Sequence, residues 1–432
     1  MNPAVTECVL ILAVCFNAIL AVLNGHGLTL QRGHVVFAEI AVYVTALAIL
    51  VFNADRRMLP WFLLALFIVL NGLLLSLGNG AFNPKYMRDV FVIPIFIMLG
   101  MTYSSRSLTK PILILQTIVF GVAVLEALSP EAYSEIFQIL KYYVNTRDFS
   151  EKSFWNSEST LFLSATRPGD RFFAFVNLHR VSSIFLEPVS LGNYCVIVAV
   201  FLIACWRELS VGTRLYLAGS TAALIIGCDG RLAASSIVIV LIGTAFLRNF
   251  SSRWSFLYLP MILVLSALFA WGFNLDAGKD NFSGRVAGSI ATLSQVNLLG
   301  LMGLDAQSSD QAADSGITYF VLTQSFVGVI VIWFAICLLP AGRSYATRLY
   351  VHGIAMFVPL NLMVSNSFFS IKVAALMWFS FGYLFLKDSP SEISSFSGGE
   401  LRAPMRRSVL NSREQFPLRK ARIQYPIDSQ AS

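Results

Sequence analysis

Long apolar runs constrain this chain more than any other feature, because each is long enough to cross a lipid bilayer. About 20 apolar residues span the hydrocarbon core as a helix, and backbone groups in lipid must be paired within the spanning element. The sequence therefore predicts an all-α, polytopic membrane protein of about 12 transmembrane helices. The fourth and eighth runs are short, and the seventh and eighth are also compatible with one broken pair. The runs are 4–23, 35–52, 59–77, 90–104, 111–128, 188–206, 213–228, 232–247, 255–273, 316–339, 349–365 and 369–386.

Composition agrees with this interpretation. Only 13% of the residues are charged and 56% are hydrophobic, whereas a soluble domain carries roughly 25% charged residues. The runs are continuous and lack the alternation of an outer-membrane barrel strand. The first run has no basic residues before it, so we expect a retained helix and not a signal peptide. The six cysteines lie in or at the ends of apolar runs without a CxxC pair, which predicts neither disulfides nor structural zinc.

The distribution of basic residues predicts the orientation of the chain. Cytoplasmic loops of membrane proteins carry an excess of Lys and Arg. With the N-terminus in the cytoplasm, five short inward loops each carry two basic residues, whereas four short outward loops carry four in total. We therefore expect both termini to be cytoplasmic. The inward residues are Arg56, Arg57, Arg106, Lys110, Arg207, Arg214, Arg248, Arg253, Arg343 and Arg348; the outward ones are Arg32, Lys85, Arg88 and Arg231.

Two long loops fall outside the membrane on the opposite side, over about 129–187 and 274–315. The first mixes charges of both signs with aromatic residues, so we expect short amphipathic helices that lie on the membrane surface. Loops of this length are usually functional or disordered. The predicted transmembrane catalytic domain ends at 386. The basic tail over 387–432 is rich in Ser, Pro and Arg and is predicted to be disordered and cytoplasmic.

Charged residues from separate segments gather on the predicted outer side. Guanidinium groups bind phosphate oxygens through two parallel hydrogen bonds and keep their charge at any relevant pH. Several such groups at a membrane surface predict a site for a lipid-linked pyrophosphate. The candidate residues are Arg180, Glu187, Arg231, Arg285, Asp314 and Lys372.

Each candidate also has a plainer interpretation. The long cationic side chains can reach lipid phosphate without any specific role, which applies to Arg180, Arg231, Arg285 and Lys372. Glu187 can simply neutralise Arg180 across an extended turn. Asp314 can be only the N-cap of the helix that follows. Glu39 and Glu126, which lie inside apolar runs, are interpreted as packing or hydrogen-bonding residues and are not candidates.

Several motifs are missing from the sequence. It contains no Walker A loop, no HExxH, no GxSxG elbow and no GxGxxG followed by an acidic residue at strand–helix spacing. The four histidines are scattered, and the aspartates of 274–315 are spaced too loosely to predict a metal site. We therefore expect no nucleotide, metal or other cofactor.

The segment RVSSIFLEPVSLGN from Arg180, the Arg231 at a tight turn, and DSGITY from Asp314 together resemble Wzy-type polysaccharide polymerases, a group that includes the O-antigen ligases. The resemblance extends over 1–386, although only these three segments carry sequence signal. It implies a GT-C-like fold in the bacterial inner membrane. Ligases of the group usually carry a histidine in the second long outer loop, and 274–315 contain none, which favours a polymerase.

The resemblance implies that the protein polymerises lipid-linked oligosaccharide repeats into exopolysaccharide by glycosyl transfer from polyprenyl pyrophosphate. Arg180, Arg231 and Arg285, with Lys372, would stabilise the leaving pyrophosphate. Glu187 or Asp314 would take the proton of the acceptor hydroxyl, and we prefer Glu187 because a carboxyl at the bilayer edge can have a raised pKa.

Expected partners are the lipid-linked substrate, membrane lipids, a chain-length regulator and a flippase, and no nucleic acid. The rival functions are a lipid-linked oligosaccharide flippase and a ligase-like transferase. A flippase should carry its charges deep in a central cavity, whereas the candidates here lie at one face.

Overall fold

The three-dimensional structure is a computed structural model of the chain. It describes residues 3–103, 106–147, 149, 161, 165, 171–173, 178–277, 282–310, 312, 315–340 and 344–387. Asp314, most of the first predicted loop after Arg147, and the tail after Lys387 therefore lie outside the described residues.

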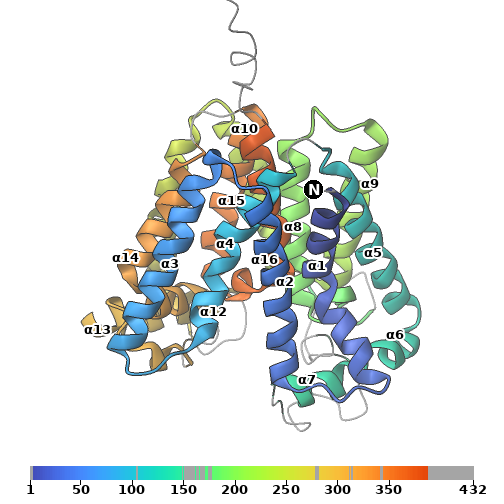
Figure 1. The fold of residues 1–432 in the computed structure, drawn as a ribbon, viewed down its shortest axis with the longest axis horizontal. Helices are drawn as coiled ribbons and strands as arrows, with labels where there is room; N and C mark the ends of the chain where they lie inside the picture. The colour runs from blue at the N-terminus through green and yellow to red at the C-terminus, as the bar shows by residue number, and fades with distance from the viewer. Residues whose placement is uncertain are drawn as a thin grey trace, which may run out of the picture. The chain divides into compact units, whose positions relative to one another are not determined.

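Each of the twelve apolar runs overlaps one helix over most of its length, and the described residues contain no strand. These twelve helices have 15 to 23 residues, and they form the bundle drawn in Figure 1. Their bounds are α1 Pro3–Gly25, α2 Arg32–Phe52, α3 Leu59–Gly78, α4 Pro84–Thr102, α5 Thr109–Leu128, α8 Pro188–Ala204, α9 Val211–Cys228, α10 Arg231–Leu247, α11 Tyr258–Gly272, α14 Gly316–Leu338, α15 Tyr345–Leu362 and α16 Ile371–Lys387.

Seven stretches among the described residues are long and apolar enough to cross a membrane. Their surfaces also suit lipid, since Phe52, Leu77 and Leu128 are each at least 79% exposed, and an exposed apolar face of this extent is unusual in a soluble protein. The chain is thus a membrane-embedded helical protein. The seven spans are Ala4–Gly25, Arg32–Phe52, Arg56–Gly78, Thr109–Leu128, Val211–Cys228, Ser252–Gly272 and Gly316–Leu338.

Short helices connect the long ones. The segment predicted as the first long loop begins with two short helices, and Figure 1 shows α6, α7, α12 and α13 towards the same end of the bundle. Their bounds are α6 Pro130–Phe137, α7 Ile139–Arg147, α12 Phe282–Ser294 and α13 Leu298–Leu301, with 3-10 turns at Arg56–Met58, Ser183–Phe185, Ser252–Leu257, Ala306–Asp310 and Ser367–Phe369.

Helix α4 begins six residues earlier than the apolar run indicates. The Asn83 side chain accepts a hydrogen bond from the Lys85 amide, and Pro84 occupies the first helical position. Both features favour a helix start. As a result, Arg88 and Asp89 lie within the helix and not in a loop before it, and their charges project among other helices.

Polar contacts join two pairs of helices close to where these helices begin. Tyr319 of α14 donates a hydrogen bond of 2.7 Å to Asp89 of α4. Lys372 of α16 lies 3.1 Å from Glu187, the residue before α8. We call the end of the bundle where α4, α8, α14 and α16 begin the charged end.

Glycines bring α4 and α16 unusually close together. A Cβ atom on Gly100 would lie 2.0 Å from the carbonyl oxygen of Phe379, and one on Gly382 would lie 1.8 Å from that of Ile97. Small residues allow helix backbones to approach in this way in membrane proteins. No side chain larger than hydrogen fits at either position without moving a helix.

We predict that Gly382→Ala destabilises the protein by about 1–3 kcal/mol, because the added methyl group overpacks the contact with α4. The measurement is the melting temperature of the purified protein in detergent. Gly121→Ala on α5 is the matched control, since nothing lies within 4 Å of the added atom and alanine favours a helix. Equal melting temperatures for the two variants would contradict the close crossing.

Candidate functional site

A strained turn over residues 180–187 leads into α8. Ser183 and Leu186 have φ angles of 51° and 61°, although neither is glycine. Non-glycine residues in such conformations cost roughly 1–3 kcal/mol and persist only where the surroundings hold them. The amide of Val181 donates to the carbonyl of Gly227 over 3.0 Å, which ties the turn to the end of α9. Contacts with the rest of the protein therefore hold the turn in this conformation.

Glu126 of α5 binds the backbone of this turn. Its side chain is fully buried, and its carboxylate accepts hydrogen bonds from the amides of Ser182 and Ser183 over 2.6 to 3.0 Å. His179 lies 3.3 Å from the same carboxylate, and the Tyr133 hydroxyl donates to the Ser183 carbonyl over 2.6 Å. The interpretation of Glu126 as a hydrogen-bonding residue is confirmed.

Glu187 is surrounded by donors, two of which are cations. Oε1 accepts from the Tyr143 hydroxyl (2.9 Å) and from Arg147 (2.6 Å). Oε2 accepts from the Ser190 hydroxyl (2.9 Å) and lies 3.1 Å from the Lys372 ammonium. Because a carboxylate offers about four acceptor positions, both oxygens are fully engaged.

The expected raised pKa of Glu187 is wrong. Burial favours the neutral form, but the charges of Arg147 and Lys372 outweigh that effect and hold the pKa of the Glu187 carboxyl well below its usual range. Glu187 is therefore ionised at neutral pH. The interpretation of Glu187 as the neutralising partner of Arg180 also needs correction, since Arg147 and Lys372 supply the charges that stabilise it.

Lys372 and Arg147 differ in their access to solvent. The Lys372 side chain is only 3% exposed and also donates to the Phe185 carbonyl over 2.9 Å. The Arg147 side chain is 42% exposed and lies over the Tyr143 ring at 4.5 Å. Lys372 was predicted as a site residue, and it does contact Glu187. Arg147 was missed, because nothing distinguishes it from the other charges of the first loop.

Arg180 and Arg231 lie at the turn between α9 and α10. Arg180 Nε donates to the Cys228 carbonyl over 3.2 Å, and Arg231 Nε lies 4.0 Å from Asp229. A further arginine, Arg171, donates to the Ile226 carbonyl over 2.9 Å. Both predicted arginines therefore contact the same short turn.

Arg285 lies on α12, and its hydrogen bond of 3.5 Å to the Val364 carbonyl places it at the connection between α15 and α16. Among the described residues, Arg285 forms no hydrogen bond or ion pair with Arg180, Glu187, Arg231 or Lys372. Asp314 lies outside the described residues.

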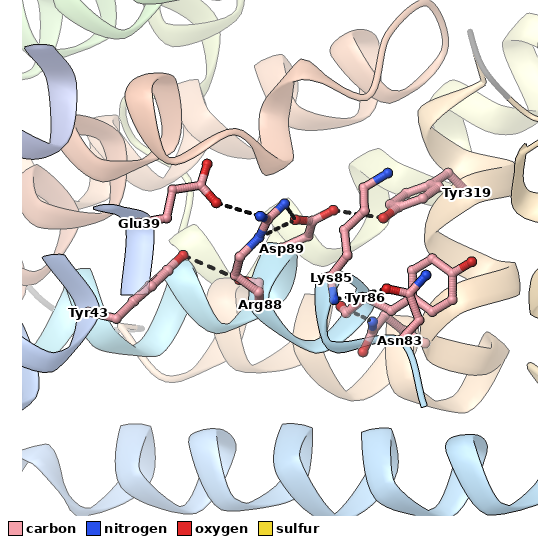
Figure 2. A network of polar contacts seen from close by, with 9 residues as sticks. Glu39, Tyr43, Asn83, Lys85, Tyr86, Arg88, Asp89 and Tyr319 are labelled. Atoms are coloured by element: carbon pink, nitrogen blue, oxygen red, sulfur yellow. Dashed lines mark hydrogen bonds and ion pairs between the residues drawn. The ribbon is translucent and has the colours of Figure 1, made fainter. Parts of the chain in front are cut away.

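A second set of charges lies at the charged end, shown in Figure 2. Arg88 pairs with Glu39 of α2 and with Asp89, whose carboxylate is bound by Arg88 Nη2 at 2.7 Å. Tyr319 donates to the other oxygen of Asp89 over 2.7 Å. Lys85 lies over the Tyr319 ring at 5.3 Å. We call Glu39, Arg88 and Asp89 the Glu39 cluster, and Arg147, Glu187 and Lys372 the Glu187 cluster.

The two clusters are electrostatic neighbours. Glu39 interacts with the charges of Arg147 and Lys372 as well as with Arg88. The Glu187 cluster has two cations and one anion, and the Glu39 cluster has two anions and one cation. Ionisable residues at membrane depth usually mark a functional site. Among the described residues, no group of three or more His, Cys, Asp or Glu side chains is arranged to hold a metal ion.

Comparison with known proteins adds no identification. The chain matches no family model, no curated protein and no solved structure.

We predict that Glu126→Gln loosens the turn over 180–187, because an amide NH₂ group then faces backbone N–H donors. Leaving a buried donor unpaired costs about 1–3 kcal/mol. Hydrogen–deuterium exchange of the purified protein should be faster for peptides covering 180–187. Gln116 of α5, which donates to Ser220 over 2.7 Å, provides the control, since Gln116→Leu should lower stability without affecting exchange in the turn. Unchanged exchange at 180–187 in Glu126→Gln would show that other contacts hold the turn.

Proposed function

We propose that the protein is a bacterial inner-membrane glycosyltransferase that polymerises lipid-linked oligosaccharide repeat units into exopolysaccharide at the periplasmic face. The observation that carries the proposal is the concentration of ionisable groups at one end of an apolar helix bundle. Glu187 directly precedes α8, Arg231 begins α10, and Lys372 is the second residue of α16. A pyrophosphate at the head of a polyprenyl chain would occupy this level of a membrane.

Helix starts add to the attraction of such a site for phosphate. The first amides of a helix are unpaired and carry partial positive charge, so phosphates bind readily at helix N-termini. Arg180 and Arg231 would bind pyrophosphate oxygens, and the Glu187 cluster adds one net positive charge nearby. As the glycosidic bond to pyrophosphate breaks, negative charge grows on the leaving group, and these groups would stabilise it.

In this proposal Glu187 organises the cationic side of the site. Its carboxylate fixes the positions of Lys372 and Arg147 by direct contacts of 3.1 and 2.6 Å. A carboxylate whose acceptor positions are filled and whose charge is neutralised twice is a weak proton acceptor. The role of base predicted for Glu187 is therefore poorly supported, and Asp314 stays a prediction.

The orientation of the chain is part of the proposal, with twelve spans, both termini in the cytoplasm and the charged end in the periplasm. We predict that a reporter fused after Arg253 is cytoplasmic and that one fused after Gln307 is periplasmic. Paired alkaline phosphatase and fluorescent-protein fusions measure both locations. Periplasmic phosphatase activity for the Arg253 fusion would contradict this orientation.

The function is tested by adding a polyprenyl-pyrophosphate-linked repeat unit to the purified protein in detergent, with no ATP and no sugar nucleotide. We expect the wild-type protein to form polymer. Arg180→Ala and Arg180→Lys should both accumulate normally, yet lose about 2–4 kcal/mol of transition-state stabilisation, or about 30- to 1,000-fold in rate, with Lys the less affected because it keeps the charge.

Arg253→Ala, at an exposed turn before α11, is the control and should polymerise at the wild-type rate. A snorkelling Arg180 would be replaced by lysine without loss, because lipid phosphate accepts either cation. Full activity of both Arg180 variants at normal abundance would remove Arg180 from the site. If polymer formation required ATP or a sugar nucleotide, the proposed transfer from a lipid-linked donor would be wrong.

A further inference from the structure

Two of the carboxylates at the charged end, Glu39 and Glu187, interact with the same cations, Arg147 and Lys372, but differ in availability. Both oxygens of Glu187 are occupied, by Tyr143 and Arg147 on one side and by Ser190 and Lys372 on the other. In Glu39, Oε2 binds Arg88, while Oε1 has no hydrogen-bond partner among the described residues. Figure 2 shows this second oxygen pointing away from Arg88.

Glu39 is nevertheless held in place. Its partner Arg88 donates from Nε and Nη2 to Asp89 over 3.1 and 2.7 Å. Asp89 in turn accepts from Tyr319, and the Tyr43 hydroxyl donates to the Arg88 carbonyl over 3.3 Å. A carboxylate whose cation is fixed by further hydrogen bonds keeps one orientation, which is what a reacting group requires.

The charge balance of the two clusters also distinguishes them. Arg88 is shared by two carboxylates, so the Glu39 cluster keeps one net negative charge. The Glu187 cluster keeps one net positive charge. The positive Glu187 cluster would stabilise an anionic leaving group, whereas the negative Glu39 cluster would attract a proton. The Glu39 side chain is 15% exposed, which leaves room for a hydroxyl group to approach.

From this geometry we propose that Glu39 is the catalytic base, with Oε1 accepting the proton of the acceptor hydroxyl. The inference rests on the proposed function. The acceptor oxygen forms a bond to the anomeric carbon of the donor as the bond from that carbon to pyrophosphate breaks. The electron pair leaves with the polyprenyl pyrophosphate, and the hydroxyl proton moves to Glu39 Oε1. The neutral carboxyl group later returns the proton to water.

The test is Glu39→Gln in the full-length purified protein, assayed with the lipid-linked repeat unit. Glutamine keeps the shape and an oxygen for Arg88 but cannot accept the proton. Because general-base catalysis contributes typically about 10²–10⁴-fold, we expect turnover to fall by about that factor. The KM for the lipid-linked repeat unit and the melting temperature should stay at wild-type values.

Glu7→Gln is the matched control. Glu7 is also a mostly buried carboxylate, 14% exposed, and it accepts from the Tyr103 hydroxyl and lies 3.4 Å from Lys110. These partners lie at the end of α4 and the start of α5, away from the charged end. The same substitution there should leave turnover at the wild-type level.

The outcomes separate the two proposals. Wild-type turnover of Glu39→Gln, in a preparation where the wild-type protein makes polymer, would overturn the role of Glu39 and leave the proposed function standing. A lowered melting temperature or a raised KM that accounts for the loss would assign Glu39 a purely structural role and overturn the inference as well. If the wild-type protein makes no polymer from the lipid-linked repeat, the proposed function fails, and the base fails with it.

Discussion

The arrangement of the charged end depends on compensating the charge of the buried Lys372 ammonium. Taking such a charge out of water costs several kcal/mol unless an opposite charge and hydrogen bonds compensate it. Compensation comes from Glu187 and the Phe185 carbonyl, both in the segment before α8. The turn must present these two groups to α16 together, and positive φ angles at Ser183 and Leu186 accompany that arrangement. The carboxylate of Glu126 then binds the amides that the turn leaves unpaired within itself.

The same requirement divides the charges of the site into two groups with different chemistry. Lys372 needs Glu187, and Glu187 also attracts Arg147, so this cluster has surplus positive charge and a saturated carboxylate. Arg88 serves both Glu39 and Asp89, so the other cluster has surplus negative charge and one open carboxylate oxygen. Stabilising a leaving anion and accepting a proton demand opposite local charge. Separate clusters can meet both demands, whereas a single ion pair cannot.

The sequence predicted the helices well because hydropathy is a local property, and each apolar run overlaps one long helix over most of its length. It misplaced the start of α4, since charges in the first turns were interpreted as loop. It predicted that Glu187 and Lys372 share a site, and they do contact each other. It missed Arg147, whereas its interpretation of Glu39 as a packing or hydrogen-bonding residue agrees with the contact to Arg88. Arg147 binds a residue 40 positions away and Arg88 one 49 positions away, and no local pattern reveals which of many charges will pair across helices.

Further along the bundle from the charged end, the packing leaves little room for a hydrophilic molecule between α4 and α16. The stretch of α4 from Val92 to Met101 is entirely buried and contains only apolar residues and glycine. It meets α16 where Gly100 and Gly382 bring the two backbones into contact. A glycan could cross there only if these helices separated and lost that contact, at a cost that no polar side chain in the stretch would offset. The packing of α4 against α16 therefore agrees with the proposal that the protein acts on its substrate at one end of the bundle.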